Sequence, residues 1–205
     1  MIRARLLAGE IGPEDRLVDH AIAAEIGVSR MPVREALLQL THEGYLESTS
    51  RGFALPQLSP QRVAETFALR RLLEPHAAAL AAQARNAQAL QRMEEALATL
   101  RTAGDVAGFH RAAESFRNAW IAAIPNGELR GAIQRYAAQV QQVRFDTMSS
   151  AVARKTIVEG LADLLAAFKA GDALAAADRT LRFIHEAEAA HASHPAASDP
   201  PRRAR

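Results

Sequence analysis

Two arginines near the start of a predicted helix could contact DNA. Arg30 and Arg34 are four residues apart, so they lie on one face of a helix close to its N-terminus. A guanidinium group in this position can pair with the O6 and N7 atoms of guanine in the major groove, or hold a phosphate. By themselves, two arginines favour an ordinary solvated helix start, so the flanking sequence must decide between the two interpretations.

The residues around this pair predict a helix-turn-helix. Gly27 can adopt the left-handed conformation that ends a helix, Ser29 suits the N-cap of the next one, and Pro32 fits its first turn. After Pro32, apolar residues recur at helical spacing and are predicted to pack inward: Val33, Ala36, Leu37 and Leu40. Helices are therefore expected over residues 18–26 and from the turn to about residue 42, after a short helix over residues 1–8.

A small β-hairpin is predicted directly after these helices. Residues 45–49 and 53–55 have strand character, and they flank a turn that contains Arg51 and Gly52. A hairpin in this place is the wing of a winged helix-turn-helix, and its tip can lie along the DNA backbone or reach the minor groove. Gly52 also fits a simpler interpretation as a turn residue with positive φ, and the two interpretations are compatible.

The rest of the chain is predicted to be helical. Six helices are expected, over residues 60–84, 87–102, 105–124, 127–148, 151–170 and 173–192. The sequence therefore predicts a mainly α fold with a winged helix-turn-helix over residues 1–56, an all-helical bundle over 57–192 and a disordered tail over 193–205.

Composition excludes several kinds of function. The 205 residues include no cysteine, so disulfides, thiol nucleophiles and thiolate metal sites are excluded. No run is long and apolar enough to span a membrane, which leads us to expect a soluble cytoplasmic protein. The chain carries a net charge of +2, but within residues 1–55 six arginines face eight acidic residues. DNA binding must therefore depend on where the arginines lie.

The sequence resembles the GntR family of bacterial transcriptional regulators. The run from Ser29 to Leu37, Ser-Arg-Met-Pro-Val-Arg-Glu-Ala-Leu, is similar to the recognition helix of that family, and residues 11–17 and 43–46 also match its winged helix. Residues 58–82 are similar to the start of the helical FCD-type effector domain of the FadR branch, and the six helices resemble the shorter, VanR-like subgroup. The chain departs from the pattern at Met31, where Thr or Ser is usual, and in a wing about one residue shorter.

This resemblance implies a regulator, in the simplest case a repressor, that binds a short palindromic DNA operator as a homodimer and responds to a small metabolite. The implied DNA contacts are Ser29, Arg30, Arg34, Arg51 and Gly52. Three alternatives remain open at this point: a helical domain that only dimerises, a TetR-like regulator without a wing, and an enzyme. The sequence offers no glycine-rich phosphate loop and no Ser-His-Asp arrangement for the last of these.

The resemblance also implies where a metal would bind. Many members of this branch hold a divalent metal with one Asp and three His, and the register places Ala113, Arg117, Leu161 and Phe183 at those positions. Ala, Leu and Phe offer no ligand atom, and Arg stays protonated. We therefore expect no metal cofactor.

An arginine at a lost metal position suggests that the effector is an organic anion, such as a carboxylate, held directly by the protein. The predicted effector-binding residues are Arg70, Arg117, Phe116, Trp120, Asn126 and Arg144. An equally good interpretation is that these arginines form internal salt bridges, for example with Glu74 or Glu114, because buried arginines need anionic partners.

Overall fold

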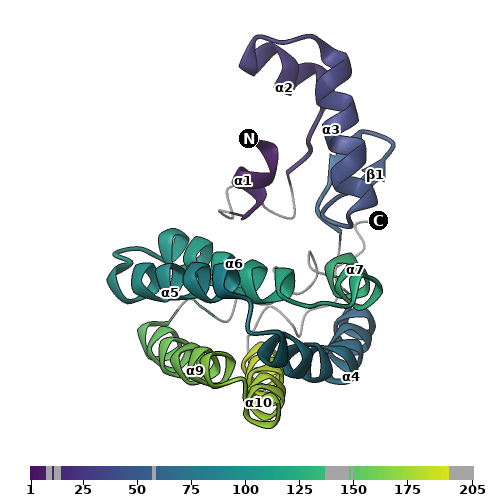
Figure 1. Ribbon diagram of the computed structural model, residues 1–205. Coiled ribbons are helices and arrows are strands. Elements are labelled where there is room, and N and C mark those ends of the chain that lie inside the picture. Colours follow the sequence, from purple (N-terminus) through teal and green to yellow (C-terminus); the bar gives the residue numbers. More distant parts are fainter. Residues whose placement is uncertain (8–10, 12–14, 57–58, 137–147, 149, 194–205) are drawn as a thin grey trace.

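The computed structural model describes residues 1–7, 11, 15–56, 59–136, 148 and 150–193, and two groups of elements follow one another along the chain (Figure 1). The first group comprises α1 (Ile2–Leu7), α2 (Asp19–Ile26), α3 (Arg30–His42), β1 (Glu47–Thr49) and β2 (Gly52–Ala54). The second comprises α4 (Pro60–Ala84), α5 (Ala87–Thr102), α6 (Val106–Ala122), α7 (Gly127–Arg135), α9 (Ala151–Ala170) and α10 (Ala173–Ala192).

The turn between α2 and α3 has the predicted geometry. Gly27 ends α2 in the left-handed conformation, with φ of 71°, and its N–H donates to the carbonyl of Ala23. Pro32 lies in the first turn of α3, where its missing N–H costs no helical hydrogen bond. Of the residues predicted to pack inward, three are buried: Val33, Leu37 and Leu40. Ala36 is exposed, because it lies at the edge of the apolar stripe rather than at its centre.

The hairpin that follows α3 forms the wing. β1 and β2 pair antiparallel, with Ser48 opposite Phe53. Phe53 also exchanges two backbone hydrogen bonds with Leu17, at 2.7 and 2.8 Å, so the wing is tied to the segment before α2. Gly52 has φ of 119°, and a Cβ there would lie 2.6 Å from the carbonyl oxygen of Leu17. Only glycine therefore fits this position, which explains Gly52 by structure alone.

The helical bundle closely follows the predicted bounds. α4, α5, α9 and α10 have the bounds given above from the sequence, and α6 is slightly shorter at both ends. Each of these helices, and α7, begins at a side chain that accepts a hydrogen bond from the backbone N–H three residues later: Ser59, Asn86, Asp105, Asn126, Ser150 and Asp172. The second half of the helix predicted over 127–148 and the tail predicted over 193–205 lie largely outside the described residues.

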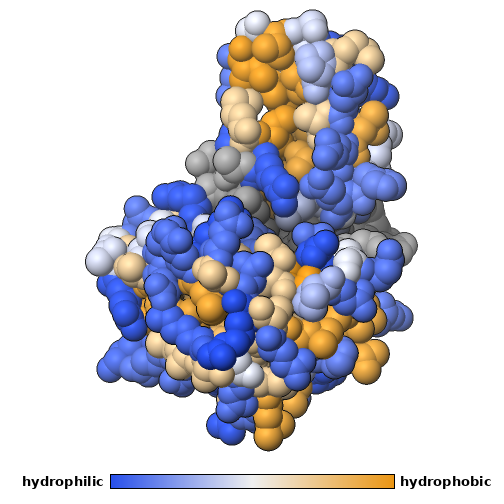
Figure 2. All heavy atoms as spheres, viewed as in Figure 1, coloured by the Kyte–Doolittle hydropathy of each residue, from blue (hydrophilic) through white to orange (hydrophobic). Residues whose placement is uncertain are grey.

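Two separate apolar cores stabilise these groups. One joins α1–α3 and the hairpin through residues such as Leu17, Leu37 and Phe53. The larger one fills the bundle, where α5 packs on α6, and α10 packs on α4 and α9. Figure 2 shows polar side chains over much of the visible surface of the bundle, with apolar patches near its lower end.

None of the helices in the described part of the chain is long and apolar enough to cross a membrane.

Candidate functional site

The two arginines of α3 converge on one carboxylate. The Nε of Arg30 lies 2.9 Å from Oδ2 of Asp19, and Nη1 of Arg34 lies 3.3 Å from the same oxygen. The Asp19 side chain, in the first turn of α2, is only 5% exposed, whereas the Arg30 and Arg34 side chains are 60% and 49% exposed. α2 thus fixes two guanidinium groups that remain open to solvent on the surface of α3.

The charge state of Asp19 follows from these contacts. The hydrogen bond from Arg30 is the main cause that lowers the pKa of Asp19; burial opposes it, and the hydrogen bonds from Arg34 and the His20 backbone N–H reinforce it. Asp19 is therefore a carboxylate at neutral pH. The sequence analysis did not single it out, because the contact joins two different helices.

The other predicted DNA contacts lie at the start of α3 or at the wing tip. Ser29 has the extended backbone of an N-cap, but its side chain makes no capping hydrogen bond and is exposed, so its predicted capping role is met by the backbone alone. Arg51 is exposed in the hairpin turn, where its backbone N–H donates to the Thr49 hydroxyl at 3.2 Å. Thr49 in turn donates to the Gly52 carbonyl, which fixes the shape of the tip.

A cavity of about 250 Å³ lies within the helical bundle. Its described lining comes from α4, α6, α9 and α10, together with Met148. Four of the predicted effector residues line it: Arg70, Phe116, Arg117 and Trp120. The four residues at the positions implied for a metal, Ala113, Arg117, Leu161 and Phe183, line the same cavity. Positions that are far apart in the sequence therefore face one cavity.

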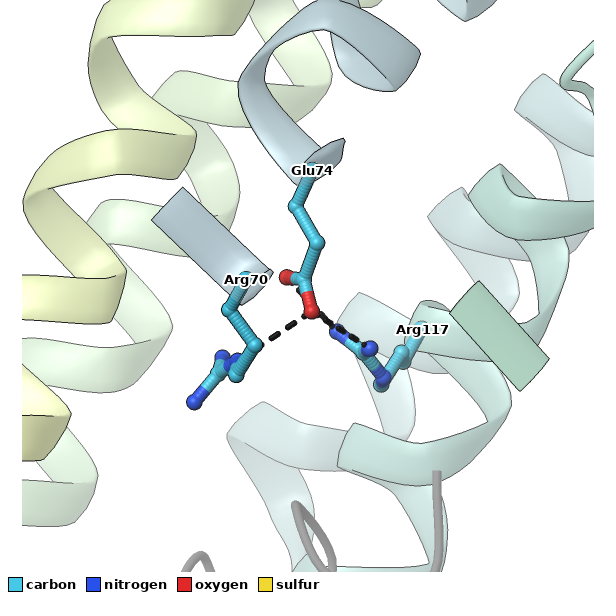
Figure 3. A network of polar contacts seen from close by, with 3 residues as sticks. All are labelled: Arg70, Glu74 and Arg117. Carbon is cyan, nitrogen blue, oxygen red and sulfur yellow. Dashed lines mark hydrogen bonds and ion pairs between the residues drawn. The ribbon is translucent and has the colours of Figure 1, made fainter. Parts of the chain in front are cut away.

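Three charged side chains form a buried network at this cavity (Figure 3). Arg117 donates two hydrogen bonds to the Glu74 carboxylate, from Nη1 to Oε2 at 3.1 Å and from Nη2 to Oε1 at 2.9 Å. Arg70 donates from Nε to Oε1 of the same carboxylate at 3.1 Å. The side chains of Arg70, Arg117 and Glu74 are 6%, 9% and 2% exposed. The internal salt bridge with Glu74 that the sequence left open is therefore present.

All three groups of this network are charged at neutral pH. Burial alone would raise the pKa of Glu74, but the charges of Arg117 and Arg70 outweigh it and lower the pKa to about 2. Burial likewise disfavours the charged form of Arg117, and the Glu74 carboxylate more than compensates, so the pKa of Arg117 is raised. Two cations facing one anion leave the network with a net charge of +1.

Comparison with known proteins identifies both halves of the chain. Residues 1–53 match the family described as bacterial regulatory proteins, gntR family, and residues 65–186 match the FCD domain. The chain belongs to the GntR family and carries an FCD domain. It is thus a DNA-binding transcriptional regulator with a helical domain, and the TetR-like alternative fails on the family match and on the observed wing.

Similar proteins with known names are also regulators. The solved structure of Escherichia coli McbR/YncC superposes with a TM-score of 0.78 at 26% identity and covers 93% of each chain. The Nta operon transcriptional regulator of Aminobacter aminovorans is 28% identical over 136 residues, 65% of each protein. The gluconate operon transcriptional repressor of Bacillus subtilis is 38% identical over 73 residues, 36% of this chain and 30% of that protein. Since all are regulators, the enzyme alternative is set aside.

One predicted effector residue of this GntR-family chain is not brought to the cavity, and a second lies outside the described residues. Asn126 is exposed and its side-chain oxygen accepts from the backbone N–H of Leu129 at 3.0 Å, so it caps α7 and is absent from the described lining. That prediction is corrected: the side chain serves the helix start instead. Arg144 lies outside the described residues.

Sequence reasoning missed three polar residues of the cavity: Thr156, Thr180 and Glu186. Thr180 of α10 lines it and is buried, yet a threonine within a helical stretch gives no sequence signal for a binding role. Among the described residues, no group of three or more His, Asp or Glu side chains is arranged to hold a metal ion. The absence of a metal cofactor in this family member stays a prediction.

Proposed function

We propose that this GntR-family regulator is a repressor that binds a short palindromic operator as a homodimer and is controlled by a small organic anion. The observation that carries the proposal is the cavity in the bundle with its net positive network of Arg70, Glu74 and Arg117. Ligand sites of small molecules are mostly apolar cavities with a few placed polar groups, and this cavity has that composition. A domain that only dimerises would have no need of a buried excess charge.

The proposed DNA contacts come from a few exposed arginines. The N-terminal 55 residues carry more acidic than basic side chains, so general electrostatic attraction to DNA is weak there. Arg30 and Arg34, which both form ion pairs with Asp19, are available to guanine bases or phosphates in the major groove. Arg51 is available to the DNA backbone near the wing.

The proposed homodimer follows from operator symmetry, because a palindromic site presents two equivalent half-sites. The helical domain also exposes large apolar side chains that an interface could cover: Leu69 and Leu72 on α4, Val152 on α9 and Leu174 on α10. Sedimentation of the purified chain tests this, and a monomer at operator-binding concentrations would contradict the dimer.

The test of DNA recognition is to define the operator by genome-wide footprinting with the purified protein, and then to compare variants on it. Arg34→Ala is expected to lose specific binding, because each half-site forfeits a contact of about 1–3 kcal/mol. Arg182→Ala is a matched control, since Arg182 is an exposed arginine of α10, paired with Asp178 far from α3. Operator affinity equal to wild type in Arg34→Ala would contradict the proposed recognition.

The test of anion control uses the same operator. A panel of small organic acids is screened for a shift in the melting temperature of the full chain and for a change in operator affinity. At least one acid should do both, while its neutral amide should do neither. If neutral compounds act as well as the acids, the anion proposal fails while the DNA-binding function stands.

A further inference from the structure

The two arginines of the cavity differ in how many of their nitrogen atoms donate a hydrogen bond to Glu74. Both terminal nitrogens of Arg117 donate to Glu74. Arg70 bonds Glu74 only through Nε, and its Nη1 is buried without a hydrogen-bond partner within the described residues. The end of the Arg70 guanidinium points away from the Glu74 carboxylate (Figure 3). Arg70 therefore has a buried donor atom left for a ligand.

A second unused polar atom lines the same cavity. The hydroxyl oxygen of Thr180 is buried and has no hydrogen-bond partner in the described part of the chain. Buried polar atoms are nearly always hydrogen-bonded, and each exception requires an explanation. Two exceptions in one cavity, a cationic donor and a hydroxyl donor, are explained together by a ligand that accepts from both.

The charges around the cavity limit the ligand to one negative charge. Arg70, Glu74 and Arg117 sum to +1, and the buried Glu114, whose charge also acts on Arg117, offsets part of that excess, so one carboxylate is the most that the network can neutralise. The only other charged residue in the described lining, Glu186, is already paired with Arg179 through two contacts of 3.0 and 3.2 Å. A second carboxylate on the ligand would find no free cation there and would be repelled by Glu74 and Glu186.

The remaining lining is largely apolar and determines the rest of the ligand. Aromatic and aliphatic side chains from α6, α9 and α10 surround the space: Phe116, Trp120, Ile157, Leu161, Leu164 and Phe183. The guanidinium of Arg70 also lies over the Phe67 ring, 5.3 Å from its centroid, which helps to fix its direction. Such a surface binds a hydrocarbon body and rejects a polyhydroxylated one, whose hydroxyls would lose water without gaining partners.

We propose that the cavity binds a monocarboxylate with an apolar body, whose carboxylate accepts from Arg70 Nη1 and from the Thr180 hydroxyl. The Arg117–Glu74 pair stays intact and holds Arg70 in place. This inference rests on the proposed anion control and adds to it the charge of the ligand, the nature of its body and the two donors that bind it.

The test measures binding to the full chain by calorimetry, with hexanoate, benzoate and phenylacetate as probes and with their amides and adipate as comparisons. A monocarboxylate should bind at least about tenfold more tightly than its amide and than adipate. If adipate binds best, the inference of a single charge is wrong although anion control survives. If none of the acids binds, the inference and the proposed anion control both fail, and operator binding is untouched.

Three variants then locate the carboxylate. Thr180→Val keeps the side-chain shape and should lower the affinity for the acid by about tenfold, without lowering the melting temperature of the free protein. Thr156→Val is the matched control, because Thr156 also lines the cavity but its hydroxyl already donates to the Val152 carbonyl at 3.3 Å. The affinity of this variant for the acid should equal that of wild type. Arg70→Met should weaken binding on the order of 100-fold. Unchanged affinity in Thr180→Val and Arg70→Met would overturn the proposed contacts.

Discussion

Two pairs of arginines each share a single carboxylate, and the guanidinium groups are exposed in one pair and buried in the other. Arg30 and Arg34 share Asp19 on the surface of the winged helix, and Arg70 and Arg117 share Glu74 inside the bundle. Both arrangements have a net charge of +1, yet water surrounds the first pair of guanidinium groups and is largely excluded from the second. Because exposed ion pairs are screened and contribute little to stability, the Asp19 arrangement can orient its arginines and still release them to DNA.

Burial makes the second arrangement structural as well as functional. In a low-dielectric interior, removal of one partner leaves an uncompensated charge, so Glu74 is required once Arg70 and Arg117 are buried. The excess positive charge cannot be neutralised by bulk counterions there, and a ligand anion can take that role. In the proposed function, the same chemistry serves contact with a polyanion at the surface and selection of a small anion inside.

The largest expected effect comes from removing the buried carboxylate. Glu74→Gln should lower the free energy of unfolding by about 3–5 kcal/mol, because two buried guanidinium groups lose the carboxylate that they share. Urea denaturation measures this. Asp178→Asn is the control, since Asp178 pairs with Arg182 at the surface of α10, and its loss should cost below about 0.5 kcal/mol. If Glu74→Gln unfolds at the same urea concentration as wild type, the buried Glu74 carboxylate does not stabilise the fold, and burial does not distinguish the two arrangements.

A second expected effect is the dependence of stability on pH. The pKa of Glu74 falls from 4.5 to about 2 in the folded chain, so the unfolded chain binds this proton first on acidification. The stabilisation is fully present above about pH 5 and is lost as the pH falls through 4.5 toward 2. The difference in unfolding free energy between wild type and Glu74→Gln should therefore be constant from pH 7 to about 5 and shrink below it. A difference that stays constant down to pH 3 would contradict the charged state of Glu74.

The comparison also shows what local sequence could predict. Features that depend on residues within a few positions of one another were predicted. They are the turn at Gly27, the first-turn position of Pro32 and the helix starts at Asn86 and Asp172. The arginines proposed to contact DNA, and the two that line the cavity, were also singled out by type and register; the other predicted arginine, Arg144, lies outside the described residues.

What sequence could not predict depends on contacts between elements. The Asp19 contact joins α2 to α3, and the choice of Glu74 over Glu114 as the partner of Arg117 requires the packing of α4 on α6. Asn126 was assigned to the cavity because its local role as a cap was not weighed against the family register. Thr180 became visible only as a buried hydroxyl without a partner in the described chain.

The smallest expected change in stability is at Asp19. Asp19→Asn keeps an acceptor for the His20 N–H but removes the charge shared by Arg30 and Arg34, so the free energy of unfolding should fall by much less than in Glu74→Gln. Specific operator affinity should fall because the guanidinium groups lose their orientation, while non-specific affinity should rise because a negative charge near the phosphates is gone. Glu25→Gln, an exposed change on the same helix, controls for charge alone. A stability loss as large as that of Glu74→Gln would show that Asp19 holds the fold, and the contrast between an orienting and a structural carboxylate would fail.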